Sequence, residues 1–200
     1  MNKLSREQLM SLEEYAEQRG AFRADIMAHK KNRKLQLGSN IRVLFEDLKT
    51  IQYQIQEMLR IEKIFERAGI EEELEAYNPL IPDGKNLKAT MMIEYDDPLE
   101  RKLRLAELIG VEKAVYLQVE GFDKVHPISN EDMSRETEDK TSSVHFLRFE
   151  FSHDMIAAWR SNANIVAGID HPHCQVAATA LESNLNSALE HDFARPTIIH

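Results

Sequence analysis

Nitrogen and sulfur donors gather in the segment from residue 141 to residue 174. Four of the eight histidines and the only cysteine of the 200-residue chain fall there. His171 and His173 are two residues apart, so both imidazoles would project to the same side of an extended segment, and Pro172 would keep that segment extended. Imidazole and thiolate ligands suit zinc or iron. The candidate ligands of such a divalent metal are His171, His173, Cys174 and His145.

A histidine can equally have a structural role. His145 shares one strand face with Leu147 and Phe149, where a buried histidine with hydrogen-bond partners is the ordinary case. The His-Pro-His-Cys spacing also differs from the paired CxxC motifs of structural zinc sites. A metal site and a purely structural role for these histidines therefore both remain open.

A second set of polar side chains follows a long helix predicted from about residue 48 to residue 68. Tyr53, Glu57 and Arg60 are interleaved with its broad apolar stripe, so the helix could present them to a ligand. Glu57 and Arg60 are also three residues apart and could simply pair with each other. With two residues from the polar side of a predicted strand, the candidate ligand-binding residues are Tyr53, Glu57, Arg60, Arg148 and Glu150.

The strands that carry such residues alternate apolar and polar side chains, which favours a mainly antiparallel sheet with one face on the core. The chain has no regular strand–helix alternation and no glycine-rich phosphate loop. We therefore predict a single α+β domain, a mainly antiparallel sheet with helices packed on its apolar face. The predicted strands are 34–37, 41–46, 89–95, 114–120, 144–151 and 165–170, and the predicted helices are 9–19, 22–32, 48–68, a short one from 71, 97–109, a short one after 151, and 176–193.

The polar face of that sheet is a second place where a ligand could bind. By alternation it collects the side chains of Arg42, Glu94, Gln118, Glu120, Arg148 and Glu150. These side chains form either a solvated surface crossed by ion pairs or a concave surface that holds a polar ligand. In the second case the stiff two-proline loop from Tyr77 to Gly84, or an acidic loop, would complete the site.

Composition narrows the functional classes. A net charge of −9 argues against a nucleic-acid or anionic-membrane surface, and a single cysteine cannot form an intramolecular disulfide. No apolar run approaches the roughly 18 residues of a membrane span or resembles a signal peptide. We expect a cytoplasmic protein with no nucleic-acid and no membrane partner. An acidic loop near 129–143 and the tail 195–200 have little to bury and are predicted to be mobile.

Several blocks of the chain resemble the signature segments of an uncharacterised bacterial protein family of unknown function. The blocks are His29–Arg33, Leu44–Asp47, Tyr53–Glu62, Tyr77–Gly84 and Lys140–Glu150. The resemblance covers nearly the whole chain. Genes of that family often neighbour genes of rubrerythrin-like proteins and iron–sulfur oxidoreductases. The resemblance therefore implies an accessory role in peroxide or redox metabolism, with redox proteins as partners, and it identifies no catalytic residue.

The leading hypothesis is a cytoplasmic accessory protein that binds a metal or a small polar ligand between the long helix, the proline loop and the 141–174 segment. The alternative is a partner-binding protein with no small-molecule site, as the acidic segment 131–139 and the apolar pair Ile198-Ile199 indicate. An enzyme of unassigned reaction is the third hypothesis. A homo-oligomer is compatible with all three.

Overall fold

The structure is a computed structural model and describes residues 3–131, 135, 137 and 139–193. The helices are α1 (Leu12–Lys31), α2 (Leu48–Glu62), α3 (Arg67–Tyr77), α4 (Pro98–Glu107), α5 (Val111–Ala114), α6 (His153–Arg160) and α7 (Ser183–Glu190), with 3-10 turns η1 (Arg6–Gln8) and η2 (Asn78–Leu80). The strands are β1 (Lys34–Leu37), β2 (Ile41–Glu46), β3 (Asn86–Ile93), β4 (Val115–Val119), β5 (Ile128–Ser129), β6 (Val144–Glu150), β7 (Ile165–His171) and β8 (Cys174–Ala180).

The strands form two antiparallel sheets, in the orders β1-β2-β3-β6-β5 and β4-β7-β8. Both sheets direct apolar side chains into one core, for example Phe45 and Phe149 from the larger sheet and Ile169 from the smaller one. Trp159 of α6 packs its ring against Phe151, with 5.5 Å between the ring centroids. Because side chains alternate along each strand, the larger sheet is left with a polar outer face.

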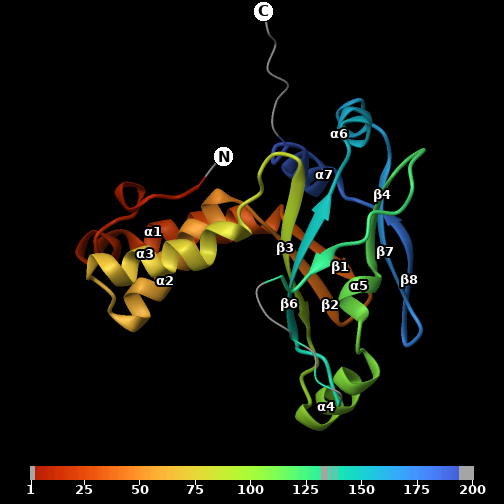
Figure 1. Ribbon diagram of the computed structural model, residues 1–200, viewed down its shortest axis with the longest axis horizontal. Helices are drawn as coiled ribbons and strands as arrows, with labels where there is room; N and C mark the ends of the chain where they lie inside the picture. Colours follow the sequence, from red (N-terminus) through yellow and green to blue (C-terminus); the bar gives the residue numbers. More distant parts are fainter. Residues whose placement is uncertain (1–2, 132–134, 136, 138, 194–200) are drawn as a thin grey trace, which may run out of the picture.

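Helices α1, α2 and α3 form an arm that projects away from the two sheets (Figure 1). The arm has its own apolar core, in which Ile55 and Leu59 of α2 pack with Leu74 of α3. The connection from sheet to arm is short, because α2 begins two residues after β2 ends. The Asp47 carboxylate caps α2 by accepting a hydrogen bond from the Thr50 backbone N–H at 2.8 Å. The cap thereby fixes the first turn of α2 directly after the end of β2.

The predicted fold class is confirmed: the protein is α+β, with antiparallel strands. The predicted strands 34–37 and 41–46 are present and pair as an antiparallel hairpin, with Leu37 opposite Ile41. One feature was not expected from the alternation of the strands. A second sheet, and not helices alone, covers the apolar face of the larger sheet.

Three predicted helix boundaries are wrong. Helix α1 continues through Gly20, because one glycine costs only about 1 kcal/mol in a helix whose Tyr15 and Ile26 are both buried. The helix predicted for 48–68 ends at Glu62, because Lys63 adopts a left-handed conformation with φ 57°, and α3 then begins at Arg67. Gly69 consequently lies inside α3.

The prediction of one helix over 176–193 is also wrong, because the first part of this segment is strand β8. Strand β8 pairs with β7 in a hairpin in which His171 lies opposite Cys174. Residues 172–173 form the turn of that hairpin. The Ala- and Thr-rich sequence of β8 suits either structure, and pairing with β7 decides in favour of the strand.

No helix in the described part of the chain has both the length and the apolar character needed to cross a bilayer. The predicted tail 195–200 lies outside the described residues. Residues 132–134, 136 and 138 of the predicted acidic loop near 129–143 lie outside them as well.

Candidate functional site

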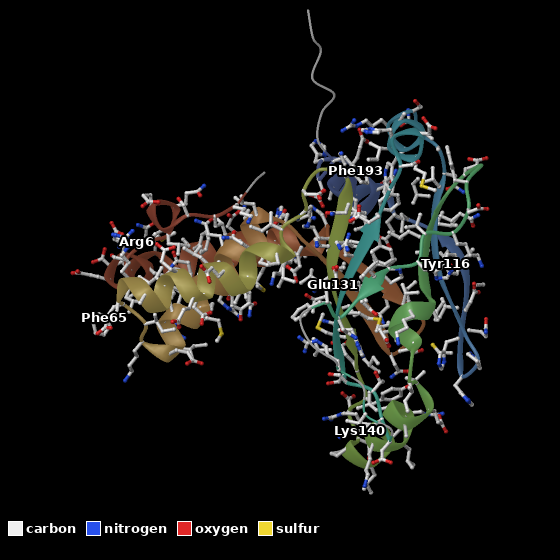
Figure 2. All side chains as sticks on the ribbon, in the orientation of Figure 1. Arg6, Phe65, Tyr116, Glu131, Lys140 and Phe193 are labelled. Atoms are coloured by element: carbon white, nitrogen blue, oxygen red, sulfur yellow. The ribbon has the colours of Figure 1, made fainter. Side chains whose placement is uncertain are left out.

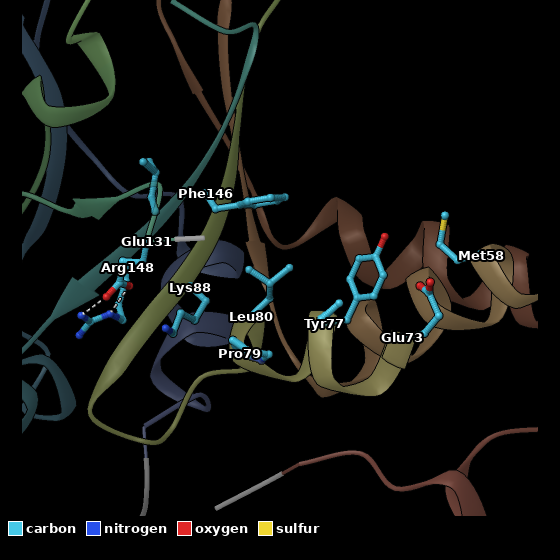
Figure 3. Close-up of a pocket in the computed structure, with 11 residues that line it drawn as sticks. Met58, Glu73, Tyr77, Pro79, Leu80, Lys88, Glu131, Phe146 and Arg148 are labelled. Carbon is cyan, nitrogen blue, oxygen red and sulfur yellow. Dashed lines mark hydrogen bonds and ion pairs between the residues drawn. The ribbon is translucent and has the colours of Figure 1, made fainter. Parts of the chain in front are cut away.

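A hollow of about 630 Å³ lies between the helical arm and the outer face of the larger sheet (Figure 3). Helices α2 and α3 and the turn η2 supply one side, and strands β3 and β6 supply the other. The lining residues are Met58, Glu73, Ala76, Tyr77, Pro79, Leu80, Lys88, Glu131, Phe146, Leu147 and Arg148. The volume falls in the range of about 300–1,000 Å³ that is typical of small-molecule sites.

Strand alternation explains which sheet residues reach the hollow. Lys88 and Arg148 lie directly opposite each other on β3 and β6. Their neighbours Leu87 and Phe149 point the other way and are fully buried in the core between the sheets. Phe146 precedes Arg148 by two residues and therefore lies on the same face. One aromatic ring and two cations thus share a small area of the outer face.

Arg148 is held by two carboxylates. Its Nε donates to Oε2 of Glu131 at 2.7 Å, and its Nη2 donates to Oε1 of the same carboxylate at 2.7 Å. Its Nη1 donates to Glu150, which also accepts a hydrogen bond from the Asn86 side chain at 3.0 Å. The Arg148 guanidinium holds the pKa of Glu131 below its usual value. Glu131 lies where the arm meets the sheets (Figure 2).

The side chain of Lys88 differs from that of Arg148 in having no hydrogen bond or ion pair with any residue that the structure describes. Its side chain is half-buried. Burial, followed by the nearby charge of Arg148, lowers the pKa of Lys88. A second hollow of about 300 Å³ is lined by Lys88, Arg148 and Pro79 as well, so the ammonium group lies where the two hollows meet.

The end of the hollow that lies on the arm, away from the sheet, is acidic. Glu73 of α3 lies there with Met58 of α2, and Tyr77 lies between them and the sheet (Figure 3). Burial raises the pKa of Glu73, and the neighbouring Glu62 and Glu72 raise it further. The hollow is therefore elongated and apolar in the middle, with cations at the sheet and a carboxyl group on the arm.

Of the predicted ligand-binding residues, Arg148 lines the hollow and its guanidinium binds Glu150, whereas Tyr53 and Glu57 of α2 contact α1. The Glu57 carboxylate accepts hydrogen bonds from the Tyr15 hydroxyl at 2.7 Å and from Arg19 at 2.7 and 2.8 Å. Arg60 lies 3.7 Å from the same carboxylate. The Tyr53 ring lies 6.1 Å from that of Phe22 of α1. These contacts hold two helices of the arm together.

The four predicted metal ligands do not form one group: the rings of His171 and His173 lie 5.9 Å apart between centroids, whereas His145 lies in the other sheet. His145 is fully buried, and its Nδ1 accepts from the Asn130 side chain at 3.0 Å while its Nε2 lies 2.9 Å from the Ser142 carbonyl. His171 has its Nε2 3.0 Å from the Ile109 carbonyl, and its Nδ1 accepts from the His173 backbone N–H at 3.3 Å. Burial raises the pKa of the Cys174 thiol.

The extended geometry assumed for residues 171–173 is wrong, because residues 172–173 form a hairpin turn. Among the residues that the structure describes, no three His, Cys, Asp or Glu side chains are arranged to hold a metal ion. Metal binding at these residues stays a prediction.

Lys88, Phe146 and Glu73 were missed by the sequence analysis. The predicted strand began at residue 89, one residue after Lys88, so its alternation was not followed far enough. Phe146 lies on the polar strand face that had been identified, and only the polar residues of that face were considered. Glu73 belongs to a run of acids on an exposed helix and carries no local signal.

Comparisons with known proteins give a family without an assigned activity. The family model described as "Protein of unknown function (DUF3501)" matches residues 3–193. A crystal structure of a "novel protein of unknown function" from Burkholderia pseudomallei K96243 is 46% identical, with a TM-score of 0.92, and the match covers 96% of this chain and 100% of that one. Among curated proteins, none matches the chain. The chain belongs to the DUF3501 family of proteins of unknown function.

Proposed function

We propose that the protein binds a small, largely apolar organic anion in the hollow between the helical arm and the outer face of the larger sheet. One observation carries this proposal: an apolar wall and an ammonium group with no partner among the described residues line the same hollow. Leu80 and Phe146 supply the wall, and Lys88 supplies the charge (Figure 3). Small-molecule sites commonly combine apolar walls with a few polar groups that orient the ligand.

The chemistry of the lining favours an anion over a neutral ligand. A half-buried ammonium loses part of its hydration without gaining a protein partner, which is unfavourable in the empty protein. An anionic group placed beside Lys88 removes that penalty. The apolar part of the same ligand then replaces water against Leu80, Tyr77 and Phe146.

On the basis of the family resemblance, we also propose an accessory role in peroxide or redox metabolism. The proposed partners are redox proteins, and the proposed location is the cytoplasm. The arrangement of side chains supports a metal less well than it supports an organic ligand. Both ring nitrogens of His171 already have hydrogen-bond partners, whereas Lys88 has none among the described residues.

Isothermal titration with 4-phenylbutyrate, an aromatic chain with one carboxylate, tests the proposal. Ala76 lines the hollow from an exposed position on α3, so Ala76→Trp should fill the hollow without disturbing the core. We expect the affinity to fall about tenfold in this variant. Ala68→Trp is the matched control, since Ala68 is exposed on the same helix and does not line the hollow.

Two results would overturn the proposal. One is the absence of binding to the natural protein at millimolar 4-phenylbutyrate. The other is equal affinity in the Ala76→Trp and Ala68→Trp variants, which would place the ligand outside the hollow.

A further inference from the structure

We infer that the anionic group of the ligand is a carboxylate, and that it takes the place of the Glu131 side chain on Arg148. This inference rests on the proposed function and specifies its ligand. Glu131 and Arg148 both line the hollow, and their side chains bind each other at its polar end (Figure 3). The protein thereby shows, with one of its own side chains, which chemical group this end of the hollow accepts.

The geometry of the pair is that of an arginine binding a free carboxylate. Two parallel hydrogen bonds, from Nε and Nη2 of Arg148, reach the two oxygens of Glu131, both at 2.7 Å. This two-pronged arrangement suits the flat, two-oxygen shape of a carboxylate. The side chain of Glu131 therefore stands in for the ligand's carboxylate.

The pair can also exchange partners readily. The Glu131 side chain is 49% exposed and that of Arg148 is 23% exposed. An ion pair at such a position contributes little to stability, because water and salt screen it. Rotation of the Glu131 side chain into solvent would free two donors of Arg148, while Glu150 continues to hold Nη1.

The charges around the hollow favour exchange over simple addition. In the empty protein, Glu131 and Glu150 already bind the guanidinium of Arg148, so a ligand carboxylate that reached Arg148 without displacing either of them would lie against two acids. If the ligand replaces Glu131, the balance of charges is kept. The ligand carboxylate then lies next to Lys88 as well, since Lys88 and Arg148 are opposite each other on β3 and β6.

The apolar wall explains why a ligand can displace a side chain that is already tethered nearby. Glu131 brings only a short aliphatic stem to the site. A ligand with a carboxylate and an apolar chain gains the contacts with Phe146 and Leu80 in addition to those with Arg148. The ligand class is therefore a monocarboxylate with an apolar chain or ring.

The test compares 4-phenylbutyrate with its neutral counterpart 4-phenylbutan-1-ol by isothermal titration against the full chain. Glu131→Gln keeps the shape of the side chain but removes its charge, so it competes less for Arg148. We expect this variant to bind 4-phenylbutyrate about threefold more tightly than the natural protein. Its affinity for the alcohol should not change.

Two further variants complete the test. Glu75→Gln makes the same change of net charge at an exposed site on α3 outside the hollow, and it should leave both affinities unchanged. Arg148→Gln removes the guanidinium that donates to the carboxylate, so it should weaken the binding of 4-phenylbutyrate about tenfold and leave the affinity for the alcohol unchanged.

The outcomes separate this inference from the proposed function. If the alcohol binds in the hollow but Glu131→Gln leaves the affinity for 4-phenylbutyrate unchanged or lower, the exchange is refuted and the hollow remains a ligand site. An equal gain in the Glu75→Gln variant refutes the exchange too, since net charge would then explain it. If neither compound binds the natural protein, both proposals fail.

Discussion

Arg33 and Lys88 are two cations withdrawn from water, and they differ in what surrounds them. Arg33 is only 2% exposed, and its guanidinium donates to the Phe45 carbonyl at 2.9 Å and the Glu46 carbonyl at 3.1 Å. It also forms ion pairs with Asp47 and Asp192. Lys88 has no such partner among the described residues and lies at an open hollow.

This difference assigns a structural role to the charge of Arg33 and a ligand-binding role to the charge of Lys88. Arg33 follows α1 directly and joins the end of that helix to β2 and to the residues after α7, so its bonds connect distant parts of the chain. The Arg33 guanidinium and its partners, the Phe45 and Glu46 carbonyls and the Asp47 and Asp192 carboxylates, form a network in which the charge is already satisfied. Burial raises the pKa of Asp192 to about 6, even though Arg33 opposes that change. The Lys88 side chain makes no such connection to the residues that the structure describes, and its donors remain available to a ligand.

The largest effect on stability is expected when the network around Arg33 is broken. Arg33→Met leaves the Asp47 and Asp192 carboxylates without their cation, which should lower the free energy of unfolding by about 3–5 kcal/mol. Urea denaturation measures this loss. Arg23→Met is the matched control on the exposed side of α1 and should change stability little. Similar losses in the two variants would mean that the network has no special structural role.

The opposite pattern is expected at Lys88. Lys88→Met should weaken the binding of 4-phenylbutyrate about tenfold, because the ligand loses its ammonium partner. The free energy of unfolding should stay the same or rise, since a half-buried charge without a partner is removed. Isothermal titration measures the affinity and urea denaturation measures the free energy of unfolding. Lys85→Met, at an exposed position, is the control for both. A loss of stability with unchanged binding would reverse the roles assigned to Arg33 and Lys88.

Glu57 lies between these extremes and gives a smaller effect that depends on pH. Hydrogen bonds from Arg19, and then from Tyr15, lower the pKa of Glu57 from 4.5 to about 2. Because the pKa is lowered in the folded state, the stabilisation is present above pH 4.5 and is lost as the pH falls toward 2.

Glu57→Gln should therefore cost about 1 kcal/mol at neutral pH, a modest value because the site is partly exposed to solvent. The difference from the natural protein should shrink as the medium is acidified. Urea denaturation at a series of pH values measures it. A difference that is constant or grows in acid would contradict the assigned partners.

The smallest effect is expected from zinc. Both ring nitrogens of His171 have hydrogen-bond partners, so neither is free to bind a metal without losing one, although the His173 ring lies close by, with 5.9 Å between the ring centroids. Excess Zn²⁺ should therefore raise the melting temperature by less than about 1 °C. A clear rise that disappears in His173→Ala would show that the hairpin rearranges to bind the metal.

The fold was predictable where local patterns and packing agree. The strand predicted for 144–151 is present as β6, and the helix predicted for 97–109 is present as α4. Residues 176–180 could not be assigned in this way. Their small, uncharged side chains suit a helix or a strand, and only the partner strand β7 decides.

The site was predictable as a set of segments but not as a set of residues. The hollow lies between α2, the proline loop and β6, which are elements that sequence reasoning had singled out. The orientation of α2 could not be predicted from the sequence. Glu57 is bound by Tyr15 and Arg19 instead of facing the hollow, and these partners lie about forty residues earlier in the chain. Long-range pairing of helices leaves no signal in the spacing of one helix.

A crystal structure with bound 4-phenylbutyrate would test the central claim most directly. We predict that its carboxylate lies within hydrogen-bonding distance of Lys88 Nζ and of Nε and Nη2 of Arg148, with the Glu131 side chain turned away and the phenyl ring against Leu80 and Phe146. A ligand bound elsewhere, with Lys88 still without a partner and Glu131 still on Arg148, would contradict it.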